Sequence, residues 1–184
     1  MRDMIVISVS RAMFSYISRR DHNLMRRLNS WRPPRWVRAW MILASRLGDG
    51  WLWWGIGLIL LFFGGPGRFV AVGAATISGT ISMALFLRLK RIINRRRPCE
   101  IQQCSWATLL PPDQFSFPSG HSMTAFSVTV PLSLSYPSLE AGLLFCAFSV
   151  AMSRILLGLH FLSDVLVGSA LGALIGYTVY SIAL

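Results

Sequence analysis

The sequence predicts an all-α integral membrane protein, a bundle of about five transmembrane helices preceded by interfacial amphipathic helices. Of its 184 residues, 54% are hydrophobic and only 14% are charged, whereas soluble domains carry about 25% charged residues. The hydrophobic residues also gather in runs that approach the length of a membrane crossing, separated by short turns. We therefore divide the chain into a basic N-terminal interfacial region (1–50) and a transmembrane domain (51–184).

The basic residues are confined to two stretches. The net charge is +11; ten of the 18 Lys and Arg residues lie in the first 46 positions, and six more lie between Arg88 and Arg97. Such a balance first suggests a nucleic-acid-binding protein. However, the rest of the chain is nearly free of charge, which is typical of a membrane protein with one basic face. We expect a lipid bilayer, not nucleic acid, as the partner, and the sequence indicates no oligomeric state.

The N-terminal region is predicted to lie on the membrane surface. The apolar segment Met4 to Ile17 is shorter than the about 20 residues needed for a crossing, so it predicts an amphipathic interfacial helix. The basic segment from Arg19 to Arg38 is expected to be irregular and to lie among lipid headgroups. Trp36 to Leu47 predicts a second short amphipathic helix, which Gly48-Asp49-Gly50 ends.

Five apolar stretches follow, and each is expected to cross the membrane. The first is short and needs a locally thin bilayer or help from flanking residues. The last carries a glycine at every fourth position (Gly168, Gly172 and Gly176), which is typical of close helix packing. With five crossings, the N-terminal region, the polar loop Lys90–Phe117 and the turn Gly158–His160 share one face. The stretches are Trp51–Gly64, Phe69–Leu89, Ser119–Ser135, Leu139–Leu157 and Phe161–Ala183.

The polar loop contains residues whose roles the sequence leaves open. Cys99 and Cys104 form a disulfide only if the loop faces an oxidising compartment. Trp106, Phe115 and Phe117 either touch a bound lipid or anchor the loop at the interface. No spacing of Cys and His typical of a metal site occurs, so no metal is expected.

His160 and Asp164 form the first candidate site. They are four residues apart at the start of a helix and share a face. A carboxylate that accepts a hydrogen bond from one imidazole nitrogen leaves the other as a directed nucleophile or base. An isolated pair of this kind more often only caps a helix. In an apolar segment, however, ionisable groups are costly and by default functional.

Pro118-Ser119-Gly120-His121 forms the second candidate site, at the start of the third apolar stretch. Ser119 is expected to cap the helix. The unpaired N–H groups of the first turn favour a phosphate there, and Gly120 allows the backbone to approach it closely. His121 would then lie beside the bound anion. Alone, these four residues also fit an ordinary helix start with a surface histidine.

Cationic donors from three separate stretches reach the same face: Lys90, Arg97 and Arg154. Arginine presents a planar fork to phosphate oxygens, and lysine adds a mobile point charge. Arg154 is far from other basic residues, so a general basic surface does not explain it. Three other basic residues are explained without a phosphate, as positive charges that end a membrane span at the cytoplasmic surface. These are Arg91, Arg95 and Arg96.

In order and spacing, these clusters resemble the tripartite signature of the type 2 phosphatidic acid phosphatase superfamily, which also includes vanadium haloperoxidases. The short chain with five spans is similar to compact bacterial lipid-phosphate phosphatases, including undecaprenyl-diphosphate phosphatases. The matching motifs are Lys90-x6-Arg97-Pro98, Pro118-Ser119-Gly120-His121 and Ser153-Arg154-x5-His160-x3-Asp164.

The resemblance implies a lipid phosphatase that works through a phosphohistidine. His160 resembles the nucleophile, and Asp164 looks like its orienting partner. His121 resembles the general acid that protonates the leaving oxygen and later activates water. No metal or other cofactor is implied, which agrees with phosphoryl transfer depending mainly on positioning and charge. The resemblance assigns the phosphoryl oxygens to Lys90, Arg97, Arg154 and the backbone around Ser119 and Gly120.

The resemblance leaves the substrate open among undecaprenyl diphosphate, phosphatidic acid and phosphatidylglycerophosphate. A phosphotransferase that uses His160 and a non-catalytic lipid-binding protein are alternatives; long apolar spans disfavour a vanadium-dependent peroxidase. The resemblance also implies a multi-pass protein of the bacterial inner (cytoplasmic) membrane. Charge bias predicts that the active site faces the cytoplasm. Many members of the family that this chain resembles act on the periplasmic side, so a periplasmic active site is the alternative.

Overall fold

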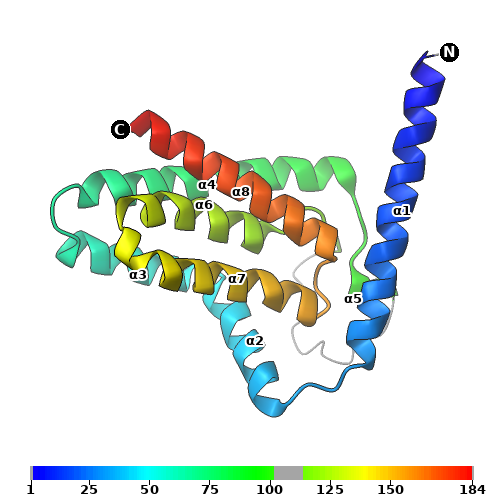
Figure 1. The fold of residues 1–184 in the computed structure, drawn as a ribbon, viewed down its shortest axis with the longest axis horizontal. Coiled ribbons are helices and arrows are strands. Elements are labelled where there is room, and N and C mark those ends of the chain that lie inside the picture. The colour runs from blue at the N-terminus through cyan, green and yellow to red at the C-terminus, as the bar shows by residue number, and fades with distance from the viewer. Residues whose placement is uncertain (1, 102–113, 184) are drawn as a thin grey trace.

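The computed structural model describes residues 2–101 and 114–183, and within them the regular structure is helical apart from one bridge between Arg96 and Phe115. The helices that follow α2 form an elongated bundle, and α1 projects from one end of it (Figure 1). The elements are α1 (Arg2–Ser30), α2 (Arg35–Leu47), α3 (Trp51–Phe63), α4 (Arg68–Ile93), α5 (Pro98–Ile101), α6 (Gly120–Ser135), the 3₁₀ turn η1 (Pro137–Leu139), α7 (Glu140–Leu156) and α8 (Leu162–Ala183).

Helix α6 is the centre of the bundle, where it packs against α4, α7 and α8. Its polar residues are small enough to be enclosed: Ser122, Ser127 and Thr129 are all completely buried. Ser127 satisfies its hydroxyl by donating to the carbonyl oxygen of Thr124 at 3.0 Å. Small hydroxyl residues of this kind let neighbouring helices approach closely.

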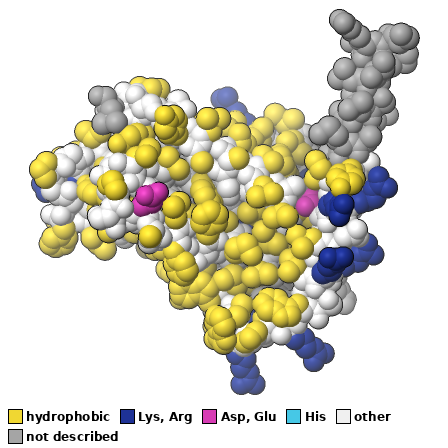
Figure 2. Space-filling view, in the orientation of Figure 1, with side chains coloured by type: hydrophobic (Ala, Val, Ile, Leu, Met, Phe, Trp, Pro, Cys, Tyr) yellow, Lys and Arg dark blue, Asp and Glu magenta, His cyan; other side chains and the backbone are white. Residues whose placement is uncertain are grey.

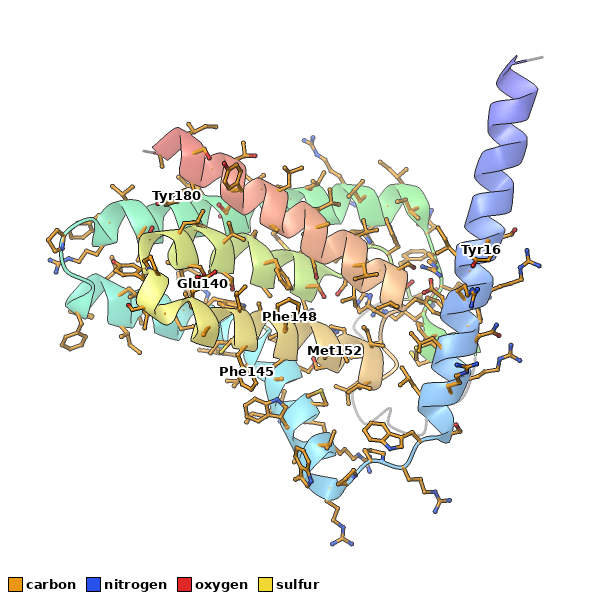
Figure 3. All side chains as sticks on the ribbon, in the orientation of Figure 1. Tyr16, Glu140, Phe145, Phe148, Met152 and Tyr180 are labelled. Atoms are coloured by element: carbon orange, nitrogen blue, oxygen red, sulfur yellow. The ribbon has the colours of Figure 1, made fainter. Side chains whose placement is uncertain are left out.

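Three of the described helical segments are long and apolar enough to cross a membrane: α4, α8 and the segment from Pro137 to Leu156. Helix α3 is apolar but shorter. Hydrophobic side chains cover much of the bundle in Figure 2. On α7, Phe145 and Met152 lie on the outer side of the helix (Figure 3) and are 59% and 45% exposed. This surface suits lipid, and the prediction of an all-α membrane protein is confirmed.

The prediction for the N-terminal region is wrong in one respect. A short helix from Met4 to Ile17 followed by an irregular segment was expected, but α1 continues to Ser30. No Gly or Pro occurs before Pro33 to interrupt it. Contacts one turn apart also support it, as between the Arg20 guanidinium and the Tyr16 hydroxyl (2.9 Å). Helix α2 and the Gly48–Gly50 turn agree with the prediction.

The glycine stripe of α8 lies directly on the backbone of α6, as predicted. A Cβ atom on Gly168 would lie 2.6 Å from the carbonyl oxygen of Ser119. On Gly176 it would lie 2.8 Å from the carbonyl oxygen of Ser127. At Gly172 the overlap with the carbonyl oxygen of Met123 is greater still. The stripe therefore fixes how closely α8 approaches the central helix.

We expect Gly172→Ala to destabilise the protein by about 1–3 kcal/mol, because α8 must move away from α6 to admit a methyl group. Thermal unfolding in detergent micelles would show a lowered Tm. Gly73→Ala in α4 is the matched control, since nothing lies within 4 Å of a Cβ there, so helix propensity alone makes it neutral or stabilising. Equal Tm values for Gly172→Ala and the wild type would contradict this packing.

Candidate active site

The three motifs meet at one end of the bundle. Helices α4 and α7 end there, and α6 and α8 begin there (Figure 1). Lys90 lies in the last turn of α4, not in a loop as expected, because α4 continues to Ile93 before Asn94 ends it in a left-handed conformation. His121 lies in the first turn of α6, and His160 lies in the turn between α7 and α8. Segments that are distant in the sequence therefore share one end of the fold.

His160 is buried with one ring nitrogen engaged and the other directed at a cation. Its Nδ1 lies 2.5 Å from the carbonyl oxygen of Ser116. Because a carbonyl oxygen only accepts hydrogen bonds, Nδ1 must carry a proton. In the neutral ring Nε2 carries the lone pair, which accepts a hydrogen bond from Nη1 of Arg97 at 3.1 Å. Nε2 is therefore the unprotonated nitrogen of the ring.

The surroundings of His160 keep its ring neutral. Burial holds its pKa well below the usual value, and the positive charges of Arg154 and Arg97 lower that pKa further. The hydrogen bond to Ser116 acts in the opposite direction but does not outweigh burial. A neutral imidazole is the form that can attack phosphorus.

Two buried guanidinium groups lie near His160. Arg97 is 3% exposed and donates from Nη1 to the carbonyl oxygen of Leu159 at 2.8 Å. Arg154 is 5% exposed and donates from Nη1 to the hydroxyl of Ser45 in α2 at 2.5 Å. Both lie close enough to influence the charge of His160. Buried guanidinium groups at the end of a membrane bundle suit a phosphate ligand.

Ser119 occupies the N-cap position of α6, as predicted. Contrary to the prediction, its side chain makes no capping hydrogen bond to the helix. Its hydroxyl pairs with that of Ser122 at 2.9 Å, and its amide donates to the carbonyl oxygen of Asp164 at 3.1 Å. Gly120 is in tight contact with a ring, since a Cβ there would lie 3.0 Å from Phe86. The Lys90 ammonium lies 5.1 Å from the centre of the same ring, which places it at the edge of the site.

Asp164 is fully buried but does not hydrogen-bond the His160 ring. Its Oδ2 lies 3.9 Å from Nδ1 of His160, and Ser116 takes the hydrogen bond that was expected here. The same Oδ2 accepts the backbone N–H of Phe161 at 2.9 Å. Phe161 is the N-cap residue of α8 and Asp164 is its third helical residue. A hydrogen bond from the N-cap amide to the side chain of the third residue is half of a capping box. Asp164 therefore fixes the turn that carries His160.

Arg95 was predicted to be only a stop signal at the membrane surface, and the structure overturns this. Its guanidinium bridges two carboxylates, Asp164 at 2.5 Å and Asp21 of α1 at 2.7 Å. It also lies 4.2 Å from the centre of the Phe161 ring. The neighbouring Arg96 is exposed, as expected. Arg95 thus ties the N-terminal helix to the turn of His160.

His121 pairs with a carboxylate that the motifs do not contain. Its Nε2 lies 2.5 Å from Oδ1 of Asp49, in the turn between α2 and α3. The hydrogen bond from His121 lowers the pKa of Asp49 below its usual value, although partial burial opposes this. Asp49 is therefore an ionised partner for His121 at neutral pH.

Two expectations for the polar loop lie outside the described residues. Cys104 and Trp106 fall within 102–113, so the structure does not describe a Cys99–Cys104 pairing or a lipid contact by Trp106. In the two stretches that it does describe, no three His, Cys, Asp or Glu side chains are grouped so that they could hold a metal ion.

Comparison with known proteins identifies the family. The sequence signature of the PAP2 superfamily matches residues 68–184, more than half of the chain. The chain belongs to the PAP2 superfamily. The matched stretch contains all three motifs.

The relatives of this PAP2 chain include named phosphatases. It is 35% identical over 89 residues to lipid A 1-phosphatase of Rhizobium johnstonii, covering 46% of this chain and 36% of that protein. It is 38% identical over 104 residues to decaprenylphosphoryl-5-phosphoribose phosphatase of Mycobacterium tuberculosis, covering 55% of each. The crystal structure of LpxE from Aquifex aeolicus superposes with a TM-score of 0.74 at 28% identity, covering 86% of this chain and 93% of that one. The chain thus spans one third to about one half of the length of these two curated relatives.

Three side chains at the PAP2 site were missed by sequence reasoning, and all precede the matched stretch: Asp21, Ser45 and Asp49. Asp21 and Ser45 carry no local signal, since each lies in a basic helix as an ordinary polar residue. Asp49 does carry a local sequence signal, because it is the acidic residue of a Gly-Asp-Gly turn on the predicted active face. That turn was interpreted only as a helix terminator.

Proposed function

We propose that this PAP2 protein is a metal-independent phosphatase that releases orthophosphate from a membrane lipid phosphate or diphosphate. The observation that carries this proposal is the buried neutral His160, whose unprotonated Nε2 accepts a hydrogen bond from the buried Arg97 at 3.1 Å. The names of the relatives support it, because lipid A 1-phosphatase and decaprenylphosphoryl-5-phosphoribose phosphatase are named for phosphates on lipids.

In the proposed first step, the lone pair of His160 Nε2 forms a bond to phosphorus. The bond from phosphorus to the lipid oxygen breaks, its electron pair stays on that oxygen, and His121 supplies the proton. Arg97, Arg154 and Lys90 stabilise the charge on the phosphoryl oxygens, as does the backbone around Ser119 and Gly120. Ser116 holds the Nδ1 proton throughout, and Asp164 acts through its charge and through the turn that it caps.

In the proposed second step, water replaces the imidazole. His121, now neutral, takes a proton from water as the water oxygen bonds to phosphorus and the N–P bond breaks. Orthophosphate leaves, and both histidines return to their starting forms. If an alcohol group of another lipid replaced water, the same site would act as a phosphotransferase.

An apolar groove of about 620 Å³ is lined by residues of α3, α4 and α6. One end is at Gly50, next to Asp49, and the other reaches Leu61 near the far end of α3. The twelve residues from Gly50 to Leu61 span about 16–18 Å along the helix axis, which is the approximate length of the groove. We assign the groove to a hydrocarbon chain of the substrate, because it is apolar, lies within the membrane-facing bundle and reaches Gly50, the neighbour of Asp49.

For the membrane topology, α3 and α6 are proposed to complete five crossings, with the active-site end in the cytoplasm. The basic residues of α1 and α2 lie at that end and favour the cytoplasmic side. The C-terminus, at the other end of α8, would then be periplasmic. A C-terminal alkaline phosphatase fusion should be active and a green fluorescent protein fusion dark; the reverse pair would place the site in the periplasm.

The neutral state of His160 predicts how activity depends on pH. Because its pKa is lowered, the nucleophilic form persists as pH falls through about 6.5, where an ordinary histidine becomes protonated. The acid limb of kcat/KM should therefore lie below pH 6.5. We would measure it with an aryl phosphate, whose own ionisation lies lower than that of histidine. An acid limb at or above 6.5 would contradict the assignment of His160 as a buried neutral nucleophile.

The function is tested by phosphate release in detergent micelles from undecaprenyl diphosphate, phosphatidic acid and phosphatidylglycerophosphate. We expect release from at least one of them, inhibition by vanadate and no loss of rate in EDTA. Loss of activity in EDTA would show that a metal is required. Phosphorylated acceptor lipid in place of orthophosphate would identify a phosphotransferase, and binding without turnover would identify a lipid-binding protein.

A further inference from the structure

The Gly48-Asp49-Gly50 turn is held rigidly beside the site. A Cβ on Gly48 would lie 2.7 Å from the Val150 side chain of α7, so the turn packs directly on that helix. Gly50 has a φ of +120°, which other residues rarely adopt. Both glycines are therefore needed to present the side chain between them. That side chain, Asp49, is the one that contacts His121.

Burial of the His121 ring and the positive charges of Arg154 and Arg97 disfavour its protonated form. Asp49 opposes this, since its Oδ1 lies 2.5 Å from Nε2 of the ring. A carboxylate at hydrogen-bond distance stabilises the imidazolium form of a histidine. The other charged or titratable groups near His121 are Arg154 of α7, Arg97 after α4 and His160 of the α7–α8 turn. Lys90 of α4 lies over the Phe86 ring, which also contacts Gly120.

We infer that Asp49 is a positioning residue that increases the protonated fraction of His121 and directs its Nδ1 to the leaving oxygen of the substrate. The inference rests on the proposed function and adds a residue outside the matched family stretch, 68–184. Because Asp49 occupies Nε2, Nδ1 is the atom left to act. The Nδ1 proton moves to the lipid oxygen as the P–O bond breaks, and Nδ1 takes a proton from water in the second step. The Nε2–H bond to Asp49 persists in both steps.

The pairing is tested without reference to activity by Asp49→Asn in the full chain. Asparagine keeps the size of the side chain and suits a tight turn, but it lacks the charge. With ¹³C-labelled histidine in micelles, the NMR titration midpoint of His121 should fall by about 1–3 pH units. Glu140→Gln, an exposed carboxylate at the other end of the bundle (Figure 3), is the control and should leave the midpoint unchanged. An unchanged or raised midpoint in Asp49→Asn would overturn the inference, and Asp49→Ser serves if Asp49→Asn does not fold.

The catalytic role is tested with two substrates that differ in their leaving group. A long-chain alkyl phosphate needs a proton on its leaving oxygen, whereas an aryl phosphate of similar length does not. In Asp49→Asn, kcat for the alkyl phosphate should fall about tenfold or more above the new midpoint, and its basic limb should move to lower pH. The rate of the first step with the aryl phosphate, measured as the burst of aryl alcohol, should not change. Equal losses on both substrates would mean that Asp49 only supports the turn, and a faster variant would mean that it restrains His121. If the wild type hydrolyses neither substrate, the proposed function fails, and the NMR titration still decides the pairing.

Discussion

Replacing His160 with alanine is expected to abolish phosphate release, lowering kcat by roughly 10⁴- to 10⁶-fold, as when the nucleophile of other covalent enzymes is removed. The reason is the geometry of Nε2, which carries no proton of its own and lies beside the Arg97 guanidinium that would bind the phosphoryl group. The measurement is orthophosphate release in micelles on whichever lipid the wild type hydrolyses fastest.

His160 is buried, so the variant must also be shown to fold. His160→Asn is the matched substitution, because its amide N–H can still donate to the carbonyl oxygen of Ser116 while no nucleophilic nitrogen remains. Both variants should be inactive, and His160→Asn should keep a Tm close to that of the wild type. Wild-type turnover by a folded His160→Asn protein would rule out His160 as the nucleophile.

Replacing His121 with alanine is expected to have the second largest effect, about 10²- to 10⁴-fold on kcat for a lipid phosphate, the usual contribution of a general acid. Its side chain is 26% exposed, so the fold depends on it less than on His160. An aryl phosphate should lose much less in its first step, because its leaving group needs no proton. Parallel measurements of the burst of aryl alcohol and of steady-state orthophosphate separate the two steps.

The expected pattern for His121→Ala is a rapid burst of aryl alcohol followed by slow turnover, because the second step still lacks its base. A loss of the same size in the burst and in the steady state, for both alkyl and aryl phosphates, would show that His121 binds the phosphate and does not transfer protons. Unchanged rates in all of these measurements would remove His121 from the site.

Most of the bundle was predictable from the sequence because lipid imposes a simple rule. A membrane-spanning helix must be apolar over most of its length and satisfy its own backbone hydrogen bonds, so its approximate ends are visible in the sequence. The stripe of Gly172 and its neighbours was equally visible, since only glycine permits such close helix contact. Helix length was less predictable, as in α4, where the basic residues Lys90 and Arg91 continue the helix to Ile93.

Contacts between distant segments were not predictable from spacing. Arg95 has the same local context as Arg96, and only the folded chain shows that Arg95 bridges Asp21 and Asp164 while Arg96 is exposed. The His160 ring was expected to bond to Asp164, one helical turn away. In the fold, the chain brings the carbonyl oxygen of Ser116 closer to the ring. Backbone carbonyls carry no sequence signal, so partners of this kind are invisible before the fold is known.

The most direct test of the account is to find the phosphoryl group on His160. The His121→Ala variant, given an aryl phosphate labelled with ³²P at phosphorus, should accumulate protein-bound label, because the step that removes it is slowed. The bond should be labile to acid and stable to base, as expected of phosphohistidine. We expect peptide mapping to place the label on His160, and the His121→Ala/His160→Asn double variant to acquire none. Label on another residue, or a burst of aryl alcohol with no protein-bound label, would contradict the account.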